Sequence, residues 1–213
     1  MPGPVAVILA AGQGTRMRSD TPKMLHPICG LPMILWPVRA AQRAGAERVI
    51  VVGAADRALE PVLPDGVELA VQRDPRGTGD AVRAAGPGEL HPVTTVLVLN
   101  GDVPLITAEA LQELVEDHER ANARATVMTT VLDDPSGYGR IVRADDGTIA
   151  KVVETKDPAD ATPDELAIEE VNAGVYAFAA GPLAEALERL RADNAQGEEY
   201  LPDVLPQLRL GKA

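Results

Sequence analysis

The chain has 213 residues, of which 46% are hydrophobic, so it is long and apolar enough to bury the core of a single domain. Its formal net charge of -12 at pH 7 argues against the basic face that nucleic-acid and anionic-membrane partners require, and we expect neither partner. One cysteine, Cys29, excludes an internal disulfide, and no Cys/His spacing fits a zinc site.

The first residues carry no targeting signal. Residues 1–4 run directly into the apolar residues 5–10, without a basic segment or a long apolar stretch. A signal peptide and a membrane span are therefore not expected. We expect a cytoplasmic protein.

The first half alternates between two patterns. Runs of Val, Ile, Leu and Ala without polar alternation, typical of strands buried on both faces of a parallel sheet, occupy residues 5–10, 49–53, 67–71 and 93–99. Helix-like stretches lie between and after them at 32–44, 78–85 and from Thr107, a candidate N-cap. This β-α-β-α-β-α-β-α order predicts an α/β, doubly wound, mostly parallel Rossmann-like sheet.

The second half indicates a small antiparallel lobe beside the sheet. Strand-like segments occupy 124–131, 140–143, 148–153 and 169–178, with a probable hairpin turn at 145–147. Residues 154–167 are polar, contain two prolines and predict an exposed loop that could act as a lid. Helical patterns return at 181–192 and 198–210.

A glycine-rich loop follows the first strand. It reads Leu9-Ala10-Ala11-Gly12-Gln13-Gly14-Thr15-Arg16, with Lys23 shortly after. Its small residues let backbone N–H groups approach a phosphate, and Arg16 and Lys23 can reach the phosphate charge. It is neither a Walker loop nor a dinucleotide fingerprint, because the required Gly-Lys and third glycine are missing. On the residues alone, a second interpretation stays open, in which the glycines only turn the chain and the two cations are solvated.

Asp102 is the candidate metal ligand. It follows the strand at 93–99, and ligands of α/β sheets bind at the carboxyl ends of strands. A carboxylate there can hold Mg2+ between phosphates, although an aspartate in this place is about as often a turn or N-cap residue.

Seven blocks of sequence, in one order, carry a family resemblance. They comprise 9–23, Gln72 with 77–79, 101–105, 137–141, 153–154, 171–174 and 194–201. The chain resembles the sugar-nucleotide pyrophosphorylases, in particular the uridylyltransferase domain of the bacterial bifunctional enzyme that makes UDP-N-acetylglucosamine. The resemblance implies a Mg2+-dependent nucleotidyltransferase of the nucleotide-diphospho-sugar transferase fold. The implied substrates are UTP and N-acetylglucosamine 1-phosphate.

The resemblance also implies roles for individual residues. The catalytic residues would be Arg16, Lys23 and the metal ligand Asp102; the nucleotide contacts Leu9, Ala10, Ala11, Gly12, Gly14, Thr15, Gln72, Gly77, Thr78 and Gly101; and the sugar contacts Gly139, Glu154, Asn172 and Tyr200, with Lys156 reaching the sugar phosphate. Tyr200 could equally pack at a core edge. We expect one domain over 1–213, with the nucleotide part at about 1–120 and the sugar part at about 121–213.

The sequence departs from the family in three places. Asn100 stands where relatives often carry an aromatic or small residue. Nothing matches the Gly-Val-Asn-Asn segment that supplies a second metal ligand, and no hexapeptide repeat is present, so we expect neither the β-helix domain nor the trimer it forms. Two alternatives stay open: a sibling transferase with another nucleotide or sugar phosphate, and a weakened homologue that binds UDP-sugars without turnover.

Overall fold

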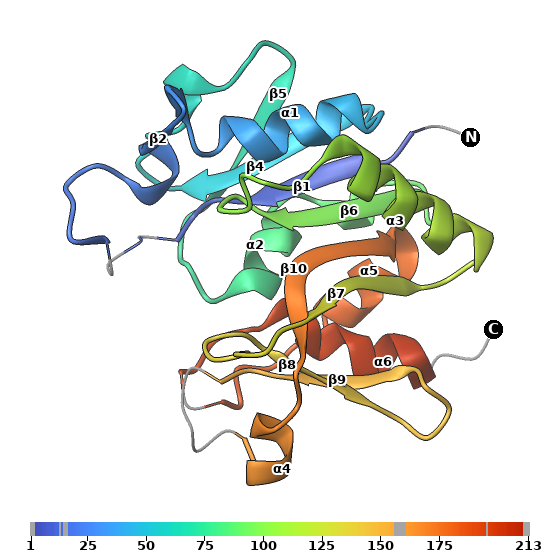
Figure 1. Ribbon diagram of the computed structural model, residues 1–213. Helices are drawn as coiled ribbons and strands as arrows, with labels where there is room; N and C mark the ends of the chain where they lie inside the picture. Colours follow the sequence, from blue (N-terminus) through green and yellow to red (C-terminus); the bar gives the residue numbers. More distant parts are fainter. Residues whose placement is uncertain (1–2, 13, 15–16, 156–160, 195, 211–213) are drawn as a thin grey trace.

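The computed structural model describes residues 3–12, 14, 17–155, 161–194 and 196–210. Within them, eight strands form one sheet in the order β5-β4-β1-β6-β10-β8-β9, and β7 pairs with β10 (Figure 1). The strands are β1 (Val5–Leu9), β2 (Pro27–Ile28), β3 (Leu31–Pro32), β4 (Arg48–Ala54), β5 (Val67–Gln72), β6 (Thr95–Asn100), β7 (Ala125–Val131), β8 (Arg140–Arg143), β9 (Ile149–Val153) and β10 (Glu170–Ala179). The α-helices are α1 (Leu35–Arg43), α2 (Thr78–Ala84), α3 (Ala108–Arg120), α4 (Pro163–Leu166), α5 (Ala180–Leu187) and α6 (Leu205–Leu210).

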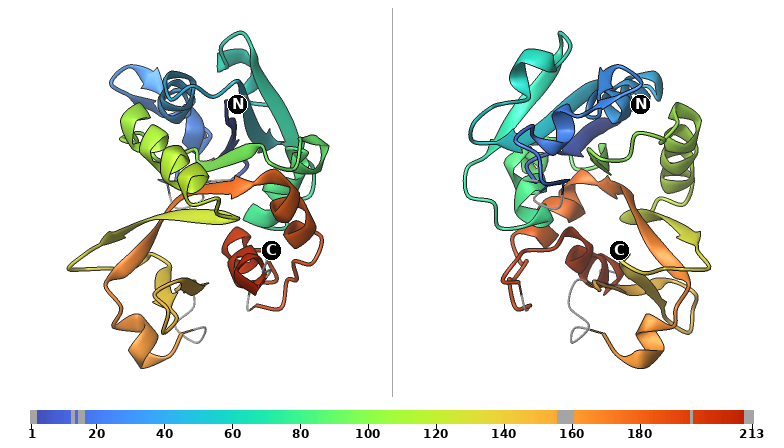
Figure 2. Two further views of the ribbon diagram at one scale, coloured as in Figure 1. Left: turned by 90° about the vertical axis from the view of Figure 1, so that its right-hand side faces the viewer. Right: turned by 60° about the vertical axis from the view of Figure 1, so that its left-hand side comes forward.

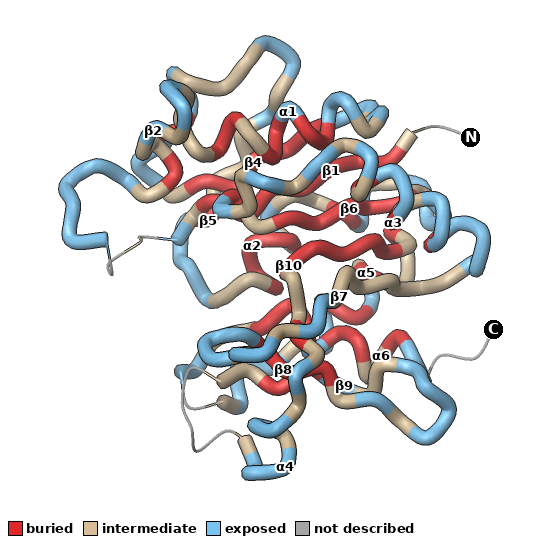
Figure 3. Tube along the Cα trace, in the orientation of Figure 1, coloured by how far each residue is buried: buried red, intermediate tan, exposed pale blue. Residues whose placement is uncertain are grey.

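The parallel part of the sheet consists of β5, β4, β1 and β6. All five residues of β1 are buried, because helices cover both faces of the sheet (Figures 2 and 3). Alternate side chains of β1 enter different cores: Val7 packs with residues of α2 and α5, whereas Ile8 packs with residues of α1 and α3. The prediction of a doubly wound α/β fold is confirmed.

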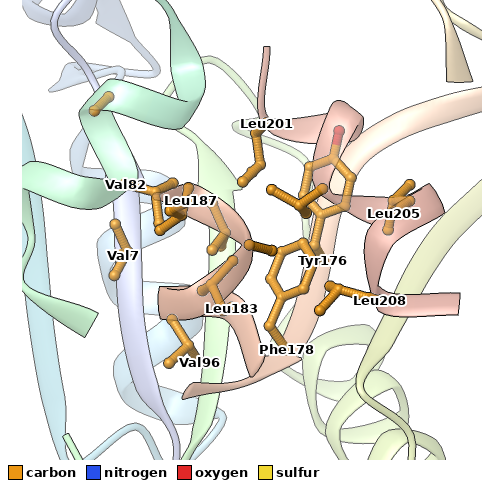
Figure 4. Close-up of a cluster of buried hydrophobic side chains, with 14 of the residues drawn as sticks. Val7, Val82, Val96, Tyr176, Phe178, Leu183, Leu187, Leu201, Leu205 and Leu208 are labelled. Carbon is orange, nitrogen blue, oxygen red and sulfur yellow. The ribbon is translucent and has the colours of Figure 1, made fainter. Parts of the chain in front are cut away.

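The core beside α5 and α6 contains the buried aromatic side chains Tyr176 and Phe178. Figure 4 shows Tyr176 and Phe178 of β10 packed between leucines of α5 and of the C-terminal segment. The two rings stack with centroids 5.6 Å apart and an interplanar angle of 20°. This core therefore attaches the C-terminal helices to the sheet.

Strand β10 joins the parallel sheet to the antiparallel lobe. Its second half lies between β6 and β7 and pairs antiparallel with both, and its first half pairs with β7 and, through Val171, with β8. The register with β7 shifts between Asn172 and Tyr176, at a bulge that contains Gly174 with φ +73°. The bulge redirects β10 from the central sheet into the lobe, where β8 and β9 form a hairpin (Figure 1).

Several elements differ from the sequence-based expectations. Between β4 and β5 the chain forms only a 3-10 turn, Glu60–Val62, because Pro61 and Pro64 interrupt a longer helix. The hairpin of β2 and β3 was not predicted, and the expected loop at 154–167 contains α4, which begins with a capping box of Thr162 and Glu165.

The C-terminal helices are also shorter than expected. The expected helix at 181–192 is α5, which ends at Leu187, and the one at 198–210 is a 3-10 helix, Leu201–Val204, followed by α6. None of the helices in the described part of the chain has both the length and the apolar character needed to cross a bilayer.

Candidate active site

The candidate site lies where the carboxyl ends of β1 and β6 adjoin. From β1 the chain continues through α1 to β4 on one side, whereas β6 pairs with the other side of β1. Such a switch point leaves a crevice at the carboxyl ends of the strands. The Gly101 N–H donates to the Leu9 carbonyl at 2.8 Å, and the Ala10 N–H donates to the Val52 carbonyl at 2.9 Å. These bonds fix the two loops that leave the strands.

Gly101 is confined by its neighbours. A Cβ at this position would lie 3.0 Å from the Leu9 carbonyl oxygen, 3.0 Å from the Met24 sulfur and 3.1 Å from Ile34 Cδ1. Glycine therefore lets the loop after β6 pass close to the loop after β1. Asp102 leaves this crowded point on the side of the crevice.

Lys23 is held beside the glycine-rich loop. It begins the 3-10 helix Lys23–Leu25, which the buried Met24 anchors to the core below α1. Gly14 has φ +62°, and a Cβ there would lie 2.6 Å from the Lys23 Cβ, so the lysine stem packs directly against the loop. The structure thus brings Gly14 and Lys23 together.

The ammonium of Lys23 forms an ion pair with an Asp102 carboxylate oxygen. The two side chains are 30% and 36% exposed. An ion pair this open to water contributes about 0–1 kcal/mol, so it separates at little cost when a charged ligand arrives. Gly14, Lys23 and Asp102 therefore meet at one point of the crevice, with opposite charges side by side.

Several expected phosphate contacts lie elsewhere or cannot be placed. Thr15, Arg16 and Lys156 lie outside the described residues. Leu9 and Ala10 are buried, so only their backbone faces the crevice edge. Among the described residues outside its own chain neighbours, none has an atom within 4 Å of where a Gly12 Cβ would be.

The candidate base-binding segment begins at Gln72, the last residue of β5, which is 5% exposed. Its amide Nε2 donates to the Gly77 carbonyl at 3.1 Å and to Asp80 Oδ2 at 2.8 Å. Gly77 has φ +124° and lies against the backbone of Glu199, where no side chain fits. The segment is thereby tied to the distant end of the chain.

Further bonds join these two segments. The Gly79 N–H donates to the Glu199 carbonyl at 2.8 Å, and the Leu201 N–H donates to the Thr78 hydroxyl at 2.8 Å. Tyr200, between these contacts, is buried and donates to Gln196 at 3.0 Å. The structure therefore places Tyr200 with the candidate base-binding segment.

A charged network surrounds Asp80. Its Oδ1 accepts from Arg76 Nη2 at 2.8 Å and from Arg83 Nη1 at 3.3 Å, and Arg83 Nη1 also lies 2.8 Å from Glu199 Oε2. Burial alone would raise the pKa of Asp80, but hydrogen bonds from Gln72 and Arg76 outweigh it and hold the pKa below its usual value. Asp80 is therefore ionised at neutral pH. A hollow of about 480 Å³ adjoins Gln72 and this network.

Three expected sugar contacts lie together in the antiparallel lobe. The Asn172 N–H donates to the Gly139 carbonyl at 2.9 Å, and a Cβ on Gly139 would lie 3.3 Å from Glu154 Oε1. The Asn172 side chain donates to the Tyr176 hydroxyl at 2.6 Å and accepts from the Gly174 N–H at 3.0 Å. Burial raises the pKa of Tyr176, so this hydroxyl stays protonated.

Asn100 connects the two halves of the site. It ends β6 directly before Gly101 and Asp102, and its side-chain amide lies against the α-carbon of Gly174 in the β10 bulge. Any larger residue at Gly174 would collide with this amide. The strand that carries Asp102 is thereby in contact with the strand that carries Asn172.

Asp102 is the residue that could hold a divalent cation. Across residues 3–12, 14, 17–155, 161–194 and 196–210, no cluster of three or more His, Cys, Asp or Glu side chains suits a metal. Mg2+ commonly takes only one or two protein carboxylates and completes its shell with phosphates and waters. A single accessible carboxylate at the carboxyl ends of β1 and β6 fits this pattern.

Sequence reasoning missed the network of Asp80, Arg83 and Glu199. The fragment Gly77-Thr78-Gly79-Asp80 suggested only a loop and a helix start, where an acidic residue also favours the helix dipole. The partner Glu199 lies in the block 194–201, which the resemblance linked to the sugar. The available signal was chemical: Arg76 and Arg83 flank the first block, and the acidic residues Glu198 and Glu199 lie in the second, so the two blocks carry opposite charges.

The comparisons with known proteins agree with this architecture. The family model of the MobA-like NTP transferase domain matches residues 6–206. The bifunctional protein GlmU of Exiguobacterium sibiricum is 46% identical over 201 residues, covering 94% of this chain and 44% of its own length. The GlmU proteins of Geobacter sulfurreducens and Mycolicibacterium vanbaalenii are 48% and 49% identical, covering 94% and 93% of this chain and 42% of their own length each.

These relatives confirm the resemblance found in the motifs, and the chain spans less than half of their length. The crystal structure of a UDP-glucose pyrophosphorylase complexed with UDP-glucose superposes with a TM-score of 0.75, covering 99% of this chain and 89% of that chain. At 18% sequence identity, this likeness shows the fold alone. The expected nucleotide-diphospho-sugar transferase fold is confirmed.

Proposed function

Because the chain belongs to the family of MobA-like NTP transferase domains, and is therefore a nucleotidyltransferase, we propose that it transfers the uridylyl group of UTP to N-acetylglucosamine 1-phosphate. An oxygen of the sugar phosphate attacks the α-phosphorus of UTP. The bond between that phosphorus and the oxygen bridging to the β-phosphate breaks, and pyrophosphate leaves. The identity of 46–49% with GlmU proteins supports this choice of substrates.

The observation that carries the proposal is the meeting of Gly14, Lys23 and Asp102 at the end of β1 and β6. The reaction needs two polyanions to be aligned and their negative charge to be offset. In our proposal the backbone amides of Gly12 and Gly14 and the side chains of Arg16 and Lys23 bind the triphosphate. Asp102 would hold Mg2+, which when bound would supply positive charge to offset that of the phosphates.

The Lys23–Asp102 ion pair has a role in this scheme. Without substrate, the Lys23 ammonium and the Asp102 carboxylate hold each other in the crevice, and their ion pair is weak enough to separate. When UTP binds, the ammonium of Lys23 turns to a phosphate oxygen, and the carboxylate of Asp102 would then be free to hold a divalent cation.

The remaining contacts follow the two halves of the chain. Leu9, Ala10, Ala11, Thr15, Gln72, Gly77, Thr78 and Gly101 line the nucleotide part, about 1–120, and Gly139, Glu154 and Asn172 line the sugar part, about 121–213. The contact of Asn172 with Gly139, beside Glu154, supports a shared sugar site in the lobe. Tyr200 lies with the base segment, so we assign it to supporting that segment.

Pyrophosphate release tests the proposal. Purified protein with Mg2+ is offered UTP, CTP, dTTP, GTP or ATP against N-acetylglucosamine 1-phosphate, glucose 1-phosphate or methylerythritol phosphate. We expect UTP with N-acetylglucosamine 1-phosphate to give the highest kcat/KM, and Lys23→Met and Asp102→Asn to lower it by about 10²-fold or more. Asp65→Asn, an exposed turn residue away from the crevice, is the matched control.

Three other outcomes are informative. A different preferred pair in the same panel would identify a sibling transferase. Binding of UDP-N-acetylglucosamine in calorimetry without turnover would identify a homologue that binds without catalysing. Full activity in Asp102→Asn would contradict the assigned metal ligand.

A further inference from the structure

The environment of Gln72 dictates which end of its amide points inward. Both of its close polar neighbours, the Gly77 carbonyl and the Asp80 carboxylate, can only accept hydrogen bonds. The NH2 group must therefore face them, and the oxygen Oε1 must face away. Gln72 and Asp80 are 5% and 9% exposed, so water cannot readily compensate a reversed amide.

Asp80 is itself held so that it cannot turn. Its Oδ1 accepts from Arg76 and Arg83, which leaves Oδ2 for Gln72 at 2.8 Å. The arginines in turn are tied to Glu199 and, through Arg83 Nη2, to the Leu187 carbonyl at 2.6 Å. The orientation of one amide at the end of β5 is thus determined by a network that reaches α5.

We propose that Asp80 is a positioning residue for base selection: it presents Gln72 Oε1, a hydrogen-bond acceptor, to the base and so selects a pyrimidine with a ring N–H. This inference rests on the proposed function, in which Gln72 faces the base. Uracil carries an N–H at position 3, whereas cytosine has an unprotonated nitrogen there. Two acceptors would face each other if cytosine bound, and a buried unpaired acceptor is strongly unfavourable.

The variant Asp80→Asn gives an unusual prediction. The oxygen of the new amide must stay towards Arg76 and Arg83, because both are donors. Its NH2 group then faces Gln72 and favours a turned amide with Oε1 inward, whereas the Gly77 carbonyl still favours the original amide, so the orientation of Gln72 is no longer fixed and its NH2 group can face the base. A donor at that position suits cytosine, so the variant should lose its preference for uracil.

Calorimetric titration with UDP and CDP tests the inference. We expect the wild-type protein to bind UDP at least about tenfold more tightly than CDP, and Asp80→Asn to reduce this ratio by about tenfold or to invert it. Glu199→Gln is the matched control, because Glu199 belongs to the same network through its ion pair with Arg83, whereas the hydrogen bond from Gln72 is accepted by Asp80; the control should alter both affinities equally. A purely structural role of Asp80 would likewise change both affinities and leave their ratio intact.

A second measurement does not depend on the variant folding. The wild-type protein is titrated with UDP methylated at N3, which has lost the ring N–H, and we expect its affinity to fall at least about tenfold below that of UDP. Equal affinity for the two compounds, no preference of the wild type for UDP over CDP, or an unchanged ratio in Asp80→Asn would each overturn the inference.

Pyrophosphate release with UTP separates this inference from the proposed function. If the wild-type protein prefers UDP, and Asp80→Asn removes that preference, but no pyrophosphate is released, the proposed function fails and the inference stands. If pyrophosphate is released and the ratio of the affinities for UDP and CDP is the same in the wild-type protein and in Asp80→Asn, only the inference fails.

Discussion

Replacing Gly14 by alanine tests whether activity depends on the position of Lys23 rather than on the stability of the fold. The new Cβ would lie 2.6 Å from the Lys23 Cβ, whereas ordinary contact begins at 3.4 Å, so the loop or the lysine must shift by roughly 0.8 Å. The obstacle is the root of the side chain, and rotation of the lysine cannot relieve it. A misplacement of about 1 Å in a catalytic group can lower the rate by about 10²-fold, and we expect kcat/KM to fall by that order.

The same substitution should change the free energy of unfolding much less than it changes kcat/KM. Gly14 has φ +62°, a conformation that costs an alanine about 1–2 kcal/mol. Gly66, with φ +82° and no atom within 4 Å of its Cβ direction, imposes the same backbone penalty without a collision. Gly66→Ala is therefore the matched control, and its urea midpoint should fall by a similar amount.

Pyrophosphate release and urea denaturation of the two variants give the decisive comparison. We expect both to lose about 1–2 kcal/mol of unfolding free energy, and only Gly14→Ala to lose activity. Wild-type kcat/KM in a folded Gly14→Ala protein would refute the reasoning, because Lys23 would then have moved without consequence. Equal loss of activity in Gly66→Ala would show that stability alone was responsible.

Three further predictions concern other parts of the fold. Burial lowers the pKa of His118 below 6.5, so the unfolded chain binds protons more readily than the folded protein. The free energy of unfolding should therefore fall as the pH drops below about 6.5. Thermal unfolding measured from pH 5 to 7.5 should show a weaker pH dependence in His118→Gln and an unchanged one in His91→Gln. Gly77→Ala would press a Cβ into the Glu199 backbone, and it should lower the urea midpoint and weaken UDP binding in calorimetry. Thr162→Ala removes the capping box of α4 and should increase hydrogen exchange at its first turn, by about 1 kcal/mol of local stability, without changing the urea midpoint of global unfolding.

The central strands could be predicted from the sequence because strands that are buried on both faces are apolar throughout. Strands buried on both faces need continuous apolar runs, and β1 and β6 carry them almost residue for residue. The loop after β1 was recognisable for a related reason, since only small residues allow close approach of its backbone. The place of Asp102 followed from the rule that ligands bind at the carboxyl ends of strands.

Other features depend on contacts between distant segments and left no local pattern. The insertion of β10 beside β6 pairs residues about 80 positions apart, and the docking of Glu199 against Gly77 joins residues more than 120 positions apart. The strands β2 and β3 have two residues each and include prolines, so they show no alternation. The orientation of Gln72 could not be predicted because Asp80 acts through space across a loop and a helix start.

The effect of Mg2+ on UTP affinity tests the central claim most directly: that Asp102 and the glycine-rich loop with Lys23 act on one triphosphate. UTP is titrated into the wild-type protein and into Asp102→Asn, each with and without Mg2+. We expect Mg2+ to tighten binding at least about tenfold in the wild-type protein and to have little effect in the variant. The same Mg2+ effect in both proteins would contradict the account, because the metal would then be held without Asp102.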